Sequence, residues 1–318
     1  MATTRILTTS HGTNREAFST LDWALFLGLA LIWGSSFLFM AIGLDAFHPG
    51  LVTWLRVAFG ALTISLFPQA RRIRVDREDL PRLRSLGLIW AAIPFTIFPI
   101  AQQWIDSAVA GMLNGATPMF TALLATILLR ALPGRLQIVG LVIGFGGIVA
   151  IALPSMGTGT TASVGVALVL VATVCYAIAL NMVIPVAQKY GSLPVMAHVL
   201  GVATLLVTPF GIYGLTQSSF EWPSLIATMA VGVLGTGIAF YMMGVLVGSV
   251  GATRAAFQTY VIPIVALTLG VIFRDEVIAP LAIVGVGLVI GGAFLASRRE
   301  TGGSGPKQPS EPSFGVTE

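Results

Sequence analysis

Charged side chains are scarce in this sequence. Asp, Glu, Lys and Arg make up 9% of the 318 residues, whereas hydrophobic residues make up 56%. An average soluble domain is about 25% charged. A soluble domain of this length could not remove so much apolar surface from water, and intrinsic disorder requires the opposite composition. The composition therefore predicts a membrane protein with many spans, whose solvent is lipid.

Cysteine and histidine are also rare. Cys175 is the only cysteine, which excludes an intramolecular disulfide and a CxxC zinc or redox site. The three histidines, His11, His48 and His198, lie far apart, so a histidine cage for a metal is not expected. We predict neither a metal nor a cofactor.

Motifs of membrane-embedded enzymes are missing as well. The chain has no GxSxG and no HExxH motif, so we expect that it is not an enzyme. Besides a membrane-embedded enzyme, a membrane scaffold or receptor is a second possible class. Such a protein would need a sizeable soluble domain or a long ordered loop, which the sequence does not show. Both of these classes remain open as less favoured alternatives.

Ten apolar segments are long enough to cross a bilayer as helices. Crossing a core of about 30 Å takes roughly 20 helical residues, and the runs are continuously apolar rather than alternating as in a barrel. We predict an all-α integral membrane fold of ten transmembrane helices. They cover approximately residues 23–43, 49–67, 86–105, 108–129, 136–154, 164–187, 193–215, 223–247, 252–273 and 278–297.

The positions of Lys and Arg predict the orientation. With the N-terminus inside, almost all of the 17 basic residues lie on the inner side; Arg274 lies outside and Arg56 lies within a span. This placement explains the net positive charge without a nucleic-acid partner. We predict a cytoplasmic segment at 1–21, a disordered cytoplasmic tail at 298–318, and a location in the inner or plasma membrane.

Two parts of the chain align with each other at one constant offset. Pro118 falls on Pro263 and Pro49 falls on Pro194, and glycines near the ends of the two blocks also coincide. The repeats, 22–154 and 164–297, each hold five spans, so the second enters the membrane inverted. Inverted repeats are typical of secondary transporters that work by alternating access. The alternative is a duplication in a static membrane protein.

Several motifs give the chain a resemblance to a known family. They are Trp33-Gly34-Ser35-Ser36-Phe37, the spacing of Pro49, Leu55-Arg56 and Ala58, small residues before Pro118 and Pro263, and Glu276 followed by Gly285 and Gly291-Gly292. In this order they resemble the EamA-type transporters of the drug/metabolite transporter superfamily. The chain departs from the family pattern at Ala131, where the first half lacks a counterpart of Glu276.

The resemblance implies ten helices around a central cavity. It also implies export or exchange of a small metabolite, such as an amino acid, a related polar compound or a drug. The sequence leaves the substrate, the direction of flux and the choice between monomer and homodimer open. No Asp or Glu lies within a predicted span, which favours a facilitator or exchanger over a carrier that uses a buried acid.

Arg56 is the only charge deep within a predicted span. A guanidinium could hold a substrate carboxylate through two parallel hydrogen bonds. It could instead be structural and pair with Glu276 or with helix-end carbonyls. We favour the structural interpretation and group Arg56 and Glu276 with Pro118 and Pro263 as structural or gating residues.

The remaining polar and aromatic residues within the spans are candidates for substrate binding. In the first span, Trp33 and Ser36 share a face that could stack on a substrate or pack against a helix. In the fourth, Asn114, Thr117 and Thr121 form a polar stripe that indicates a cavity or an interhelical hydrogen bond. The other candidates are Thr173, Tyr176 and Asn181 in the sixth span, Thr236 and Tyr241 in the eighth, and Gln258 and Thr259 in the ninth.

Overall fold

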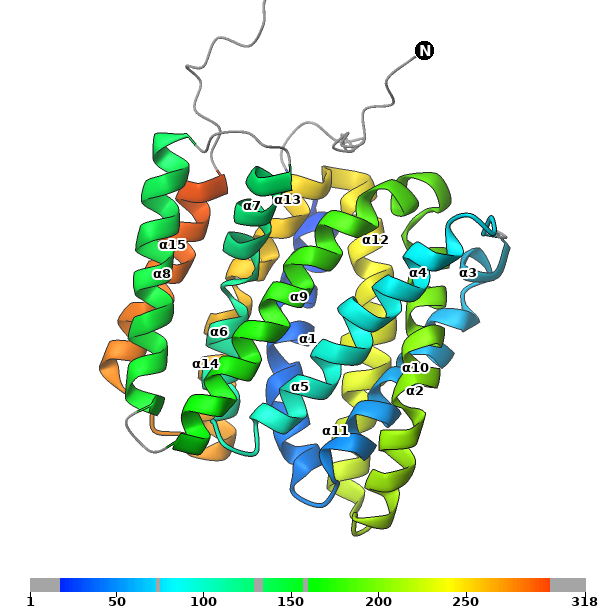
Figure 1. The fold of residues 1–318 in the computed structure, drawn as a ribbon, viewed down its shortest axis with the longest axis horizontal. Coiled ribbons are helices and arrows are strands. Elements are labelled where there is room, and N and C mark those ends of the chain that lie inside the picture. The colour runs from blue at the N-terminus through cyan, green and yellow to red at the C-terminus, as the bar shows by residue number, and fades with distance from the viewer. Residues whose placement is uncertain (1–17, 73–74, 129–133, 157–159, 298–318) are drawn as a thin grey trace, which may run out of the picture.

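The described part of the chain is entirely helical. The computed structural model describes residues 18–72, 75–128, 134–156 and 160–297, and these contain helices and no strand. Most of the segment predicted at 1–21, the tail predicted at 298–318, and Ala131 lie outside the described residues. The helix that begins at Thr20 and the helix that ends at Ser297 reach the same face of the bundle (Figure 1).

Within the described residues, eight helical stretches are long and apolar enough to cross a membrane. They are Thr20–Leu44 (α1), Pro49–Leu66 (α2), Leu80–Ala101 (α4, η1 and α5), Arg135–Ser155 within α8, Thr160–Tyr190 (α9), Ser192–Thr216 (α10), Trp222–Val250 (α11, η2 and α12) and Arg254–Arg274 (within α13, η3 and α14). Pro280–Ala296, within α15 (Pro280–Ser297), is a shorter apolar helix. The chain is therefore a multi-pass membrane protein.

Helix α1 begins with polar residues that cap its N-terminus at the edge of the apolar region. The hydroxyl of Ser19 accepts a hydrogen bond from the backbone N–H of Asp22, and the Asp22 carboxylate accepts one from the backbone N–H of Ser19. This capping box satisfies backbone donors that the helix cannot pair internally. The apolar run that follows crosses the bundle without interruption.

The fourth predicted span is a broken helix. The prediction of one continuous helix at 108–129 is wrong, because α6 (Ser107–Asn114) ends and α7 (Thr117–Leu128) begins after a short turn. Pro118 has no N–H to donate to the carbonyl of Asn114, four residues earlier. The Thr117 hydroxyl donates to that carbonyl instead, at 2.8 Å.

The ninth predicted span is interrupted at the matching place. Residues 252–273 do not form one regular helix; they are divided into α13 (Ala252–Ala256), the 3₁₀ turn η3 (Phe257–Tyr260) and α14 (Ile262–Arg274). Gly115 in the first break lies directly against Pro263 at the second, where a Cβ atom would collide with the proline ring. The two breaks therefore meet inside the bundle.

Two further irregular segments have π-helical geometry. They are η1 (Gly87–Ala92), between α4 (Leu80–Leu86) and α5 (Ile93–Ala101), and η2 (Val233–Ile238), between α11 (Trp222–Gly232) and α12 (Ala239–Val250). Such wider turns occur frequently at functional sites. They redirect side chains that a regular helix would place elsewhere.

Closely packed helix pairs form the two ends of the bundle. Helix α10 lies along α2 at one end, and α15 lies along α8 (Arg135–Met156) at the other (Figure 1). Backbone meets backbone in the second pair, because a Cβ atom on Gly292 would lie within 2.5 Å of the Gly140 carbonyl oxygen. Small residues permit this approach, which favours helix association in lipid.

A polar cluster joins the turn that precedes α4 to the end of α9. The Lys189 ammonium lies 2.7 Å from carboxylate oxygens of both Asp76 and Asp79, and the Tyr190 hydroxyl also donates to both carboxylates. The hydrogen bonds from Lys189, and then those from Tyr190, lower the pKa of both aspartates. Lys189 and Asp76 are exposed, so these ion pairs contribute little to stability, whereas Tyr190 is buried.

The close contact between Gly140 of α8 and Gly292 of α15 gives a direct test of the packing. We expect Gly292→Val to force α8 and α15 apart and to lower the free energy of unfolding by about 1–3 kcal/mol. The control is Gly287→Val on the same helix, because nothing lies within 4 Å of a Cβ atom built there. Thermal unfolding in detergent should separate the two variants, and equal melting temperatures would contradict the close contact.

Candidate functional site

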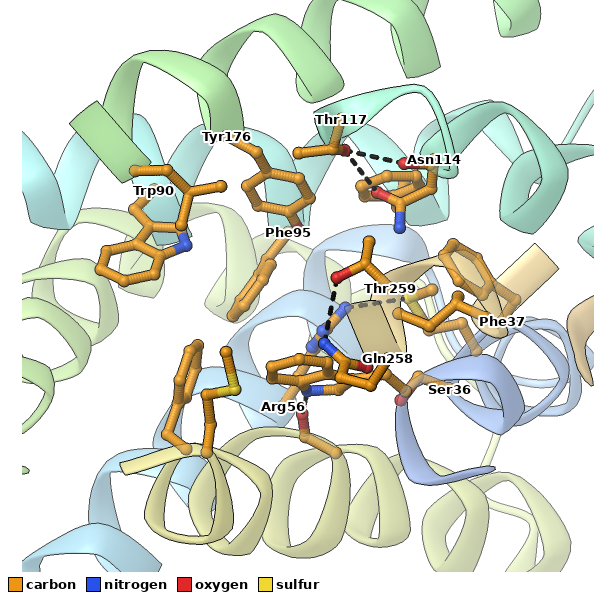
Figure 2. A pocket seen from close by; sticks show the side chains of 18 of the residues that line it. Ser36, Phe37, Arg56, Trp90, Phe95, Asn114, Thr117, Tyr176, Gln258 and Thr259 are labelled. Atoms are coloured by element: carbon orange, nitrogen blue, oxygen red, sulfur yellow. Dashed lines mark hydrogen bonds between the residues drawn. The ribbon is translucent and has the colours of Figure 1, made fainter. Parts of the chain in front are cut away.

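A cavity of about 200 Å³ lies where the broken helices and the π-helical segments meet. Most of its lining is apolar, and a few polar groups converge on it (Figure 2). The lining residues are Trp33, Ser36, Phe37, Met40, Arg56, Trp90, Phe95, Phe98, Asn114, Thr117, Tyr176, Leu180, Gly235, Phe240, Met243, Ala256, Gln258, Thr259 and Ile262.

Aromatic rings form much of the wall. Trp33 and Trp90 each meet the ring of Phe240 edge to face, with centroids 6.1 and 5.7 Å apart, and Tyr176 stacks on Phe98 at 5.9 Å. The indole N–H of Trp33 donates to the carbonyl of Gly235, within the π-helical segment η2, at 3.0 Å. The wall is therefore rigid and suited to an apolar or planar group.

The polar groups come mainly from the two helix breaks. Asn114 and Thr117 lie at the first break, and Gln258 and Thr259 lie at the second (Figure 2). The Gln258 amide nitrogen donates to the Thr259 hydroxyl at 3.0 Å. Its amide oxygen is buried and has no hydrogen-bond partner among the residues that the structure describes. The broken backbone thus brings polar side chains to a depth where lipid surrounds the bundle.

Arg56 reaches the cavity from α2. Its Nε lies 3.4 Å from the Thr236 hydroxyl oxygen, its Nη1 lies 3.2 Å from the Met40 sulfur, and its Cζ lies 3.7 Å from the centre of the Phe95 ring. All three neighbours are electrically neutral. The ion pair with Glu276 that the structural interpretation suggested does not form.

Glu276 has a different partner. Its carboxylate accepts hydrogen bonds from the backbone N–H groups of Ser107 and Ala108, at 2.9 and 2.8 Å, and from the Ser107 hydroxyl at 2.6 Å. These are the first residues of α6, so a residue between α14 and α15 caps a helix from the first half of the chain. Burial, and then the nearby Glu276 carboxylate, raise the pKa of Asp106 beside this cap.

Comparison with known proteins identifies the family. Residues 23–153 and 163–298 each match the EamA-like transporter family. The chain belongs to this family. The family match and the helices long enough to span a bilayer together make the protein a membrane transporter.

Relatives over most of the chain carry related names. The probable terminal-alkyne amino-acid exporter of Streptantibioticus cattleyicolor is 28% identical and covers 88% of this chain and 94% of its own. The uncharacterized transporter YdfC of Bacillus subtilis is 25% identical, covering 86% and 88%. The uncharacterized inner membrane transporter YedA of Escherichia coli K12 is 27% identical, covering 86% and 89%.

A solved crystal structure has the same fold. It is 18% identical to this EamA-like chain, covers 88% of it and 97% of its own length, and superposes with a TM-score of 0.58. At this identity, the similarity concerns the fold alone.

The cavity gathers eight of the sixteen residues that the sequence singled out, and the other eight lie outside its lining. The eight that line it are Trp33, Ser36, Arg56, Asn114, Thr117, Tyr176, Gln258 and Thr259. Those outside the lining are Thr121, Thr173, Asn181, Thr236, Tyr241, Pro118, Pro263 and Glu276.

Some outer residues support the lining, and others have separate roles. Thr236 contacts Arg56, whereas Tyr241 stacks on Phe67 with ring centroids 4.4 Å apart. Asn181 donates to the Thr121 carbonyl at 3.4 Å, which joins α9 to α7.

The sequence alone did not point to most of the aromatic wall. Trp90, Phe95, Phe98 and Phe240 lie in long apolar runs in which no polar stripe marks the side that faces the cavity. One signal was available: at the offset that aligns the two prolines, Phe95 falls on Phe240.

The Glu276 cap can be tested with a neighbouring control. We expect Glu276→Gln to weaken the charge-assisted hydrogen bonds at the start of α6 and to lower the free energy of unfolding by about 1–2 kcal/mol. Asp275→Asn changes the charge of the adjacent residue and keeps a side chain that tolerates the left-handed backbone at φ 51°. If the two variants lose equal stability in thermal unfolding, the cap does not stabilise the protein.

Proposed function

We propose that the protein is a secondary transporter that moves a small metabolite across the inner or plasma membrane by alternating access. The metabolite is an amino acid, a related compound or a drug, and the protein acts as an exporter or exchanger. The observation that carries this proposal is the cavity at the meeting point of the two helix breaks. Discontinuous helices of this kind surround the substrate site in many secondary transporters.

The composition of the cavity wall supports two inverted repeats. At the offset that aligns Pro118 with Pro263, Phe95 corresponds to Phe240 and Asn114 to Thr259. Both members of each pair line the cavity. A central site built from equivalent positions of two halves is what alternating access requires, because each half can then take the other's conformation.

The packing of the helices supports the same architecture. Helix α2 packs on α10 and α8 packs on α15, and the members of each pair are counterparts under the repeat. Helix α6 packs on α14, so the two broken crossings also lie against each other. With α6 and α7 counted as one broken crossing, and α15 as the last, the proposed number of transmembrane segments is ten. The ends of α1 and α15 on one face agree with an even number, and we propose that this face is cytoplasmic (Figure 1).

The size of the cavity favours a small solute. About 200 Å³ is less than the roughly 300–1,000 Å³ of pockets that hold drug-sized ligands. The Streptantibioticus relative is named a probable terminal-alkyne amino-acid exporter, which supports the same size class. We propose that the substrate contacts residues from both helix breaks and from the aromatic wall, namely Trp33, Ser36, Asn114, Thr117, Tyr176, Gln258 and Thr259.

A counterflow assay tests the transport function. The purified protein would be reconstituted in proteoliposomes preloaded with single compounds from a panel of amino acids, related acids and cationic drugs. We expect at least one compound to drive uptake of its own radiolabelled form. If no solute moves while the protein remains folded, a scaffold or a membrane-embedded enzyme becomes the better interpretation.

Trp33→Ala tests the cavity as the site of binding. Loss of the ring should raise the half-saturating substrate concentration about tenfold or more, because a large apolar contact is removed. The control is Trp23→Ala, which removes a half-exposed tryptophan from the outer surface of the same helix. Unchanged transport in the Trp33 variant would place substrate binding elsewhere.

A further inference from the structure

Arg56 is a cation with no anion beside it in the described structure. Only 6% of its surface is exposed, and its contacts among the described residues are a threonine hydroxyl, a methionine sulfur and an aromatic ring. The described carboxylate of Glu276 is bound at the start of α6. The cavity lining, as far as the structure describes it, contains no Asp or Glu.

A buried charge in this situation needs a partner. Removing a guanidinium from water is expensive, and neutral contacts compensate for only part of the loss. Charged residues within membrane spans normally pair with an opposite charge or face a water-filled cavity. Arg56 faces the cavity, so an anion bound there would offset the part of the desolvation cost that the neutral contacts do not.

Gln258 supplies a second, independent observation. Its side chain is 1% exposed and lines the same cavity, and no donor in the described part of the chain reaches its amide oxygen. The amide nitrogen donates to the Thr259 hydroxyl, so the oxygen is the end of the amide that lacks a partner among the described residues. An unsatisfied buried acceptor destabilises the protein, so a ligand that brings an N–H or O–H group would relieve this cost.

We propose that Arg56 binds a carboxylate of the transported metabolite and that the amide oxygen of Gln258 accepts a hydrogen bond from the same molecule. This rests on the transport function proposed above and narrows its substrate class. The ligand is a small carboxylate with an apolar body, which the aromatic wall surrounds, and a hydrogen-bond donor. A compound that carries only positive charge is excluded as a substrate, because its cation would lie beside the unpaired guanidinium of Arg56.

A carboxylate fits better than a phosphate ester. A phosphate group carries a charge near −2 at neutral pH and three acceptor oxygens, which calls for several cationic or backbone donors. Among the described lining residues, Arg56 is the only cation. One guanidinium matches one carboxylate in both charge and geometry.

Two kinds of molecule share this chemistry, a zwitterionic amino acid and a monoanionic acid. Leucine and 2-hydroxyisocaproate have the same apolar body and differ in an ammonium against a hydroxyl, while leucinamide keeps the ammonium and loses the carboxylate. In counterflow with the wild-type protein, we expect exchange of at least one of the two acids and none of leucinamide. Leucinamide competing as well as the acids would overturn the proposal.

The membrane potential separates the two acids. Transport of a monoanion moves one net charge, so a potential of 100 mV should support a concentration ratio of about 50-fold for a uniporter. Transport of a zwitterion moves none. Potential-dependent uptake of 2-hydroxyisocaproate identifies the monoanion as the substrate, and potential-independent uptake of leucine identifies the zwitterion; both outcomes support the carboxylate site.

Substitutions then assign the charge to Arg56. We expect Arg56→Gln to raise the half-saturating concentration of the transported acid about 10- to 100-fold, because a charge-assisted pair is lost. Arg56→Lys should retain part of the affinity. The control, Arg84→Gln, removes an exposed guanidinium from α4 and should leave transport unchanged.

Thermal unfolding distinguishes this role from a structural one. If Arg56 awaits a ligand anion, Arg56→Gln keeps or raises the melting temperature of the ligand-free protein and abolishes its increase on adding the acid. A structural arginine would instead lower the ligand-free melting temperature and leave the increase intact. That second result, or wild-type affinity in a folded Arg56→Gln protein, overturns the proposal.

Failure of this inference differs from failure of the transport function. A protein that exchanges neutral or cationic compounds, without competition from either acid, is a transporter whose cavity does not select a carboxylate. A folded protein that exchanges nothing refutes the transport function itself.

Discussion

The need to satisfy backbone hydrogen bonds away from water shapes this molecule. Irregular backbone at membrane depth is tolerated only where protein or a cavity covers it. The two helix breaks obey this constraint, because they pack against each other at Gly115 and Pro263 and line one cavity. Threonine hydroxyls occupy carbonyls that prolines leave without a donor: Thr117 serves Asn114, and Thr53 serves Phe95, four residues before Pro99.

The same constraint explains why polar chemistry is concentrated in the centre of the bundle. Regular helices need no side-chain help, and their faces are free to be apolar. The breaks do need help, and the residues that provide it project polar groups inward. A cavity with an aromatic wall and polar groups at the breaks is thus a consequence of interrupting helices where they cross.

Charge is distributed under a related constraint. Glu276 and Arg56 are the two charges that a reader of the sequence would pair, and the structure keeps them apart. Glu276 meets the first backbone N–H groups of α6, which a helix cannot satisfy by itself. The described side chains that contact Arg56 are all neutral. Among its described surroundings, the cavity is therefore the place where an anion can bind beside it.

The sequence by itself determined the solvent of this protein and the approximate position of nearly every helix, because apolar run length and scarce charge are properties of composition. It also located Asn114, Thr117, Gln258 and Thr259, since polar residues stand out within apolar runs. Only the tertiary structure decided that the fourth and ninth predicted spans are broken helices, which rings face the cavity, and where the Glu276 carboxylate binds. Those features depend on contacts between segments far apart in the chain, and an evenly apolar helix carries no periodic signal that would reveal its inner face.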